Sequence, residues 1–182
     1  MSAFTDAEIA NLREVVAKQK ITEVLHRYCR GIDRCDLDTL LTVFWADAET
    51  DYGAGRQNAV DWSVATVGAL KHMHRTQHSV GNVLIHLEGE RASAETYCHA
   101  YHEIEGPDGR VEMVVAGRYL DRLEYRDGEW RIAERLYVMD WNRNIPSTCR
   151  WDEGIYATLN NRGARKPDDL LYRGPAFAGT RS

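Results

Sequence analysis

A histidine and an aspartate that could share a proton stand at two turning points of this sequence. His78 lies in the stretch 74–82, HRTQHSVGN, where a helical pattern gives way to a strand pattern, and Asp33 ends the N-terminal helical region. A neutral imidazole has an unperturbed pKa of about 6.5, so it can accept a proton near neutral pH without a metal. A buried carboxylate on its other ring nitrogen fixes the tautomer and stabilises the imidazolium. The two residues are therefore candidates for proton transfer inside a pocket.

Simpler roles for these residues remain open. A histidine at the start of a strand is often a hydrogen-bonded structural residue, and Asp33 alone could serve in the turn after a helix. His72, His74 and His78 could chelate Zn²⁺ or Fe²⁺ if all three lay on one strand. The first two fall at the end of an expected helix or in the next loop, so we expect no metal site. No phosphate-binding glycine loop, dinucleotide fingerprint or nucleophile elbow is present, and we expect no cofactor.

The N-terminal half shows the periodicity of helices. Thr5 followed by Glu8 is a capping-box pattern, and apolar residues then recur at helical spacing as far as Gly31, a reasonable stop. We expect this helix to be broken near residues 18–20. The other expected elements are a helix capped by Asp36 that carries Leu37, Leu40, Leu41 and Phe44 inward, a short strand over 48–52, and a helix over 57–72.

The C-terminal half changes to the period of strands. Residues 76–139 are expected to form a four-stranded antiparallel meander joined by three short turns, one of which contains the Asp-Gly pair 127–128. Residues 91–105 alternate cleanly, which predicts a strand with one buried face. Small residues dominate one face of that strand, and His102 lies on it. We therefore expect His102 to point toward the interior.

Size and composition limit the class of protein. The chain has 182 residues, enough for one domain with a proper core, and a net charge of −5, which argues against a nucleic-acid surface. It has no apolar run of membrane-spanning length and no signal-peptide pattern, so we expect a cytoplasmic protein that binds neither nucleic acid nor membrane. The four cysteines are expected to be reduced and mostly buried. We place a domain at 1–145 and a C-terminal extension, packed on it or on a neighbouring subunit, at 146–182.

The order of elements indicates the fold class. Helices followed by a long meander predict an α+β domain, a curved antiparallel sheet covered by N-terminal helices, with a cone whose mouth can hold a small ligand. The chain resembles the SnoaL-like family of the nuclear-transport-factor-2-like superfamily over roughly residues 8–140. The resemblance rests on three segments: 30–40, RGIDRCDLDTL; 75–78, RTQH; and 119–132, YLDRLEYRDGEWRI.

Within that family the pattern is most similar to scytalone dehydratases and hexachlorocyclohexane dehydrochlorinases, which eliminate a small molecule from a cyclic substrate without a cofactor. This resemblance implies a catalytic pair of His78, the general base, and Asp33, which orients it. It also implies a set of substrate-pocket residues, which are Tyr28, Tyr52, His102 and Arg135. A second dehydratase tyrosine falls on Ile32, and the dehydrochlorinase lysine falls on Tyr28, so the pocket around the pair differs from both.

The expected function is a cofactor-independent lyase or isomerase, dehydratase-like, that acts on a small apolar cyclic substrate. Two alternatives remain open. One is a non-catalytic ligand-binding or structural subunit, as in ring-hydroxylating dioxygenases, and the other is a polyketide cyclase or hydratase. Relatives form trimers or dimers through the outer face of the sheet, so we expect a homo-oligomer. Tyr97, His99 and Tyr101 on that face are compatible with a subunit interface.

Overall fold

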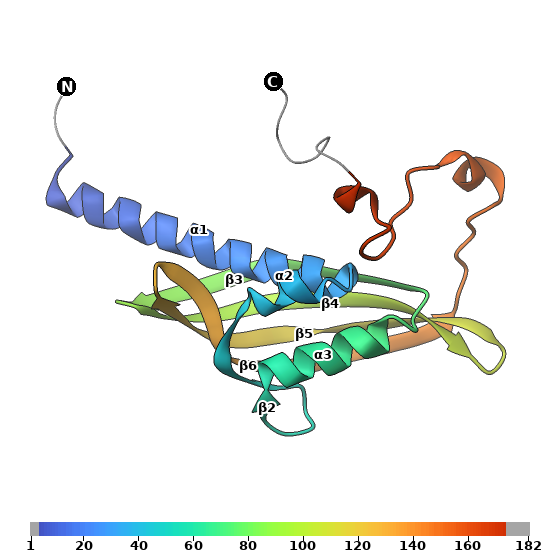
Figure 1. Cartoon of the computed structure of the whole chain (residues 1–182), viewed down its shortest axis with the longest axis horizontal. Coiled ribbons are helices and arrows are strands. Elements are labelled where there is room, and N and C mark those ends of the chain that lie inside the picture. The colour runs from blue at the N-terminus through green and yellow to red at the C-terminus, as the bar shows by residue number, and fades with distance from the viewer. Residues whose placement is uncertain (1–3, 174–182) are drawn as a thin grey trace.

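The computed structural model describes residues 4–173 and shows a curved sheet with helices along one of its faces (Figure 1). The helices and strands follow in this order: α1 (Asp6–Asp33), α2 (Leu37–Leu41), β1 (Phe44–Asp51), β2 (Gln57–Asn58), α3 (Ala59–Leu70), β3 (Arg75–Glu88), β4 (Arg91–Gly106), β5 (Gly109–Arg126), β6 (Glu129–Pro146), and two short 3₁₀ helices, η1 (Gly154–Thr158) and η2 (Leu170–Tyr172). The expected α+β class is confirmed.

Helix α1 begins at the predicted capping box. The Thr5 hydroxyl accepts a hydrogen bond from the Glu8 N–H, and the Glu8 carboxylate accepts one from the Thr5 N–H at 2.8 Å. The expected break near residues 18–20 is wrong, because α1 is one helix of 28 residues. The helix also continues past Gly31, where a Cβ would lie 3.1 Å from the backbone of Leu40. This glycine therefore allows α2 to pack closely against α1 instead of ending the helix.

The predictions for the middle of the chain were right in type and partly wrong in extent. Asp36 caps α2 as expected, since its carboxylate accepts a hydrogen bond from the Thr39 N–H at 3.2 Å. Phe44 was expected on that helix but is the first residue of β1, where it is still buried. Helix α3 spans Ala59–Leu70, within the predicted 57–72, and Asn58 caps it.

The six strands form one sheet in the order β2-β1-β6-β5-β4-β3. The predicted antiparallel meander is confirmed as β3–β6, although its last strand continues to Pro146. The expectation of a wholly antiparallel sheet is wrong, because β1 pairs with β6 in parallel and makes the sheet mixed. The β5–β6 register shifts at Gly117, where a Cβ would lie 2.1 Å from the Val138 carbonyl oxygen. Only glycine fits this irregularity in the pairing of the two strands.

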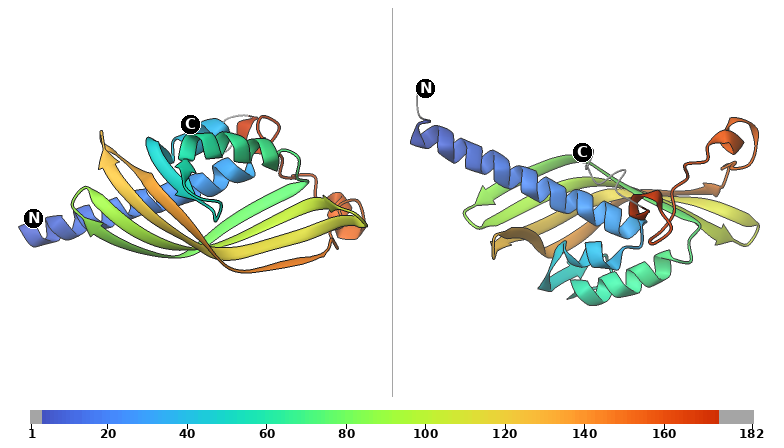
Figure 2. Two further views of the ribbon diagram at one scale, coloured as in Figure 1. Left: turned by 90° about the horizontal axis from the view of Figure 1, so that it is seen from below. Right: turned by 45° about the horizontal axis from the view of Figure 1, so that its top comes forward.

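The helices cover the concave face of the sheet (Figure 2). The small-residue face of β4 lies under them as predicted, and its buried residues are Ala92, Ala94, Thr96, Cys98, Ala100 and His102. The convex face carries the alternate residues and leaves several large apolar side chains exposed, which are Leu84, Tyr97, Leu120, Leu136 and Trp141. The concave face is therefore the one that can enclose a ligand.

After β6 the chain returns to the end of α1 as an irregular segment, called here the returning segment (residues 147–172; Figure 1). The first part of this segment holds η1, which is a 3₁₀ helix. The Lys166 N–H donates to the Arg34 carbonyl oxygen at 2.8 Å, and the Lys166 ammonium pairs with Asp36 at 2.8 Å. These contacts fix the segment to the turn between α1 and α2. The division into a domain at 1–145 and an extension at 146–182 stays a prediction.

All four cysteines are free thiols, of which Cys29, Cys35 and Cys98 are buried and Cys149 is exposed.

Within residues 4–173, no helix combines the length and the apolar composition that crossing a membrane requires.

Candidate active site

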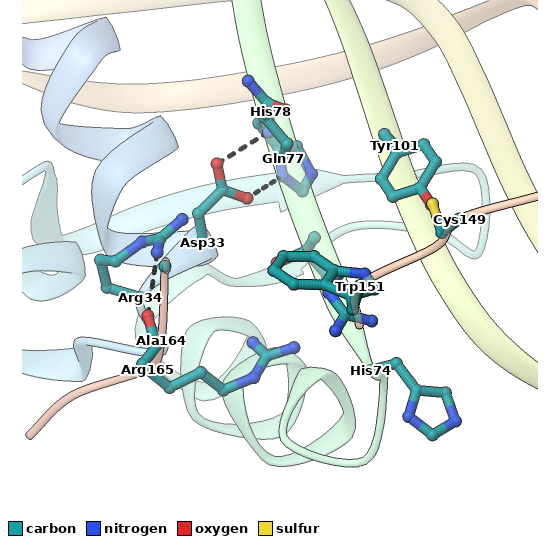
Figure 3. A pocket seen from close by; sticks show the side chains of 13 residues that line it. Asp33, Arg34, His74, Gln77, His78, Tyr101, Cys149, Trp151, Ala164 and Arg165 are labelled. Carbon is teal, nitrogen blue, oxygen red and sulfur yellow. Dashed lines mark hydrogen bonds and ion pairs between the residues drawn. The ribbon is translucent and has the colours of Figure 1, made fainter. Parts of the chain in front are cut away.

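The structure brings the two predicted catalytic residues into direct contact (Figure 3). Asp33 is the last residue of α1, and His78 lies near the start of β3. The His78 backbone N–H donates to Asp33 Oδ2 at 2.8 Å, and the ring Nδ1 lies 2.8 Å from Oδ1. An ionised carboxylate only accepts hydrogen bonds, so this contact assigns the ring proton to Nδ1. In the neutral ring, Nε2 then carries a lone pair that can accept a proton.

Both side chains of the pair are shielded from water, with 9% of the His78 side chain and 8% of the Asp33 side chain exposed. The pairing of β3 with β4 leaves space around the His78 imidazole, because the residue opposite it is small. His78 stands opposite Ala100 on β4, and Thr76 stands opposite His102, so the two histidines are diagonal neighbours on one face. Their ring centroids lie 5.2 Å apart with the planes nearly perpendicular.

A cavity of about 180 Å³, called here the inner cavity, lies beside this pair on the concave face. Its walls are mostly aromatic and aliphatic, and the lining residues used below are Tyr28, Tyr52, His78, His102 and Tyr119. A cavity of this size and composition suits one small ring rather than an extended polar ligand. The predicted residues Tyr28, Tyr52 and His102 therefore all line the same cavity as His78.

The hydroxyl groups of Tyr28 and Tyr52 lie 2.6 Å apart and form a hydrogen-bonded pair. Burial, together with the charge of the neighbouring Tyr52, raises the pKa of Tyr28 well above 10.0, and burial raises the pKa of Tyr52 to about 12. Both hydroxyls are therefore protonated near neutral pH. One hydroxyl donates to the other, which leaves one O–H to donate to an oxygen atom in the cavity.

His102 is buried in the same wall, and its Nδ1 has no hydrogen-bond partner among the described residues. Burial first, and the nearby His78 second, lower the pKa of His102 from 6.5 to about 4. The ring is therefore neutral at pH 7. A neutral ring can present an N–H or a lone pair to a ligand but adds no charge to the cavity.

The structure places Arg135 behind the inner cavity and not in its wall. Its guanidinium makes two hydrogen bonds of 2.7 Å to Asp121, and both side chains are fully buried. The guanidinium carbon lies 4.2 Å from the ring centroid of Tyr28 and 4.0 Å from that of Tyr119. We expected Arg135 to line the substrate pocket. The structure instead places it under the tyrosines, where it supports their rings, because Asp121 on the adjacent strand holds the guanidinium there.

Trp62 of α3 lines the cavity and was missed as a site residue in the sequence, as were two aromatic residues of the sheet, Tyr119 and Tyr137. The two tyrosines stand opposite each other on β5 and β6, and Tyr119 also stands opposite the buried Thr96 of β4. Cross-strand register is the signal that could have found them, because residues directly opposite each other share a face.

The alternative metal site of His72, His74 and His78 does not form. The His74 ring lies 2.6 Å from Glu105, and the His78 ring is held by Asp33. In the part of the chain that the structure describes, no three histidine, cysteine, aspartate or glutamate side chains are grouped as metal ligands would be.

This fold and site define a nuclear-transport-factor-2-like domain with a buried histidine–aspartate pair beside a small cavity. A family model, the SnoaL-like domain, matches residues 13–136, and the chain therefore belongs to the SnoaL-like domain family. No curated protein matches the sequence.

Several solved structures share the fold at low sequence identity. A type 3 hexachlorocyclohexane dehydrochlorinase from Novosphingobium barchaimii has a TM-score of 0.68 and 17% identity, with 77% of this chain and 99% of that chain covered. A candidate scytalone dehydratase from Novosphingobium aromaticivorans has a TM-score of 0.64 and 20% identity, with 75% and 96% covered. The Kfla4162 protein from Kribbella flavida has a TM-score of 0.65 and 18% identity, with 69% and 92% covered. At these identities the likeness shows the fold alone.

Proposed function

We propose that this protein is a cofactor-independent lyase or isomerase that removes a proton from a small, apolar, cyclic substrate. The observation that carries the proposal is the buried His78–Asp33 pair, hydrogen-bonded at 2.8 Å, whose histidine lines the inner cavity. Fold neighbours that are named for the elimination of hydrogen chloride or water support the same reaction class.

In the proposed reaction, His78 Nε2 accepts a proton from a substrate carbon that lies next to a carbonyl or to a carbon bearing a leaving group. The electron pair of the broken C–H bond forms either an enolate or a new double bond as the leaving group departs. Asp33 keeps the ring oriented and stabilises the imidazolium until it returns the proton. Such positioned proton transfer contributes about 10²–10⁴-fold in rate.

The tyrosine pair would supply the second half of the chemistry. An enolate or a departing oxygen gains negative charge as the proton leaves, and a hydrogen-bond donor placed beforehand stabilises that charge. The free O–H of the Tyr28–Tyr52 pair is such a donor, and both residues line the cavity together with His78. His102, neutral in this wall, is a further candidate donor.

We also propose that the protein is a homo-oligomer, a dimer or a trimer, through the convex face of the sheet. The apolar side chains of that face are exposed in the single chain, including Tyr97, at 48%, and Trp141, also at 48%. Exposed apolar patches of this kind are typical of interaction surfaces.

The test measures proton abstraction directly. The wild-type protein is incubated in D₂O with a panel of cyclic ketones and cyclic halides, and exchange of substrate hydrogen or product formation is followed by NMR. We expect His78→Asn to abolish activity on any compound that the wild type converts, because asparagine cannot act as the base. His86→Asn is the matched control, since His86 is an exposed histidine of the same strand. Equal activity of His78→Asn and wild type would reject the proposal.

A further inference from the structure

His78 lines two cavities, and the second one has a different character. Beside the inner cavity lies a cavity of about 470 Å³, called here the outer cavity, between β3, the end of α1 and the returning segment (Figure 3). Its charged wall is formed by Asp33, Arg34, His74, Arg75 and Arg165. A ligand that reaches His78 from the outer cavity therefore passes several cationic side chains.

The other two arginines of this wall already have a partner of opposite charge. Arg34 pairs with Asp169 at 3.0 Å, His74 contacts Glu105, and Asp33 is held by His78. Arg75 pairs with the buried Glu103 and stacks on the ring of Trp151. Arg34 and Arg75 are therefore balanced by their partners and add little net charge to attract a ligand.

Arg165 is different. Among the residues that the structure describes, its guanidinium donates hydrogen bonds only to the Cys35 sulfur, at 2.7 Å, and the Met73 carbonyl oxygen, at 3.1 Å. Within residues 4–173 no carboxylate lies within ion-pair distance of it. A guanidinium has five N–H donors and prefers planar, bidentate acceptors such as a carboxylate. Arg165 therefore brings to the outer cavity a positive charge with unused donors.

The position of this charge is fixed before any ligand binds. Ala164 accepts a hydrogen bond from Arg34 and donates its N–H to Asp169 at 2.8 Å, and Lys166 is bonded to Asp36. Arg165 lies between these two anchored residues, and its side chain extends toward the interior of the outer cavity in Figure 3. A donor that is held in place loses little conformational entropy when it binds an anion.

We infer that Arg165 binds a single carboxylate group on the substrate, while the ring of that substrate lies at His78. The inference rests on the proposed function and names the substrate class more closely, as a small cyclic carboxylic acid. A singly charged group fits better than a phosphate, because the Asp33 carboxylate lines the same cavity and repels a second negative charge. The substrate carboxylate serves in recognition and takes no part in bond breaking.

The test compares acids with uncharged molecules of nearly the same shape. Binding of benzoate and 3-phenylpropanoate, and of benzamide and 3-phenylpropanamide, is measured by calorimetry at low ionic strength on the full-length protein. We expect wild type to bind at least one acid about tenfold or more tightly than its amide, as a charge-assisted hydrogen bond allows. Arg165→Gln should remove this preference, and Arg165→Lys should reduce it, because lysine keeps the charge without the bidentate geometry.

Arg150→Gln is the matched control. Arg150 lies on the same segment, is exposed, pairs with Glu153 and does not line the outer cavity, so its loss should leave the preference unchanged. Circular dichroism shows whether each variant is folded. If Arg165→Gln is unfolded, the binding preference of Arg165→Lys decides whether Arg165 binds the carboxylate. Any of three results would overturn the inference. They are no preference in wild type, an unchanged preference in Arg165→Gln (or in Arg165→Lys where the glutamine variant is unfolded), and tighter binding of inorganic phosphate than of either acid. Because binding is measured and not turnover, an intact preference in a protein with no lyase or isomerase activity would reject the proposed function alone.

Discussion

Asp33 accepts two hydrogen bonds from one residue, the backbone N–H of His78 and its ring Nδ1, both at 2.8 Å. The two bonds use both carboxylate oxygens and join the end of α1 to the start of β3. Because the backbone bond does not depend on the ring, it keeps the carboxylate in place while the imidazole gains and loses a proton. The double contact therefore holds the carboxylate in the place where it can orient the ring.

Replacing Asp33 by asparagine should abolish activity without unfolding the protein. The asparagine oxygen can still accept the His78 backbone N–H, but its amide group then donates to Nδ1 and moves the ring proton to Nε2. The loss in kcat/KM should be about 10⁴-fold, as expected when a catalytic histidine is held in the wrong tautomer. Asp108→Asn, in an exposed turn, is the control. Activity of the Asp33 variant within about tenfold of wild type would contradict the assigned role.

The tyrosine pair gives a second prediction. Tyr28→Phe or Tyr52→Phe leaves one hydroxyl that can still donate, whereas the double variant leaves none. We expect the double variant to lose about 10²–10³-fold in kcat, the usual cost of an oxyanion donor, and each single variant to lose less. Because burial raises the pKa of Tyr52 to about 12, ionisation of this pair should not limit activity near pH 9. Tyr97→Phe on the convex face is the control, and full activity of the double variant would remove the pair from the mechanism.

Much of the framework was predictable because its signals are local. The capping box of Thr5 and Glu8, the cap at Asp36 and the alternation of residues 91–105 each depend on residues a few positions apart. The pair of His78 and Asp33 was reached through the resemblance, because nothing in the spacing of two residues 45 positions apart shows that they meet.

The features that sequence reasoning missed depend on contacts between distant segments. The parallel pairing of β1 with β6 has no local pattern, and it extends the predicted strand 48–52 back to Phe44. The sequence predicts a helix stop at Gly31, because the close packing of this glycine against Leu40 is visible only in three dimensions. Arg165 lies in a segment without periodicity, so its place in the outer cavity could not be foreseen.

The buried pair of Arg135 and Asp121 gives a prediction about stability. Arg135→Met leaves the Asp121 carboxylate buried without a partner and should reduce the free energy of unfolding by about 3–5 kcal/mol. Adding Asp121→Leu should recover part of this loss, because the unpaired charge is then gone. Urea denaturation measures both effects. Arg131→Met, which breaks an exposed ion pair with Glu129, should change stability little. A cost for Arg135→Met no larger than for this control would show that the pair is not needed.

His102 gives a prediction about pH. Its pKa is lowered from 6.5 to about 4 in the folded protein, chiefly by burial, so the unfolded chain binds more protons between those values. Stability therefore rises with pH across this window, and the contribution of a neutral His102 is lost as the pH falls from 6.5 to about 4. The slope from one such group approaches about 1.4 kcal/mol per pH unit. Carboxylates that titrate in the same range also contribute, so the wild type alone does not isolate this effect.

The difference between wild type and His102→Gln isolates it, because the carboxylates are common to both. The free energy of unfolding is measured by urea denaturation at a series of pH values across the window. Wild type should lose more stability than His102→Gln as the pH falls, and the two curves should become parallel as the pH rises past 6.5 and the unfolded histidine becomes neutral too. His86→Gln, at an exposed position, should follow wild type throughout. Parallel curves for wild type and His102→Gln over the whole range would mean that His102 titrates alike in both states, and a neutral His102 in the cavity wall would no longer be supported.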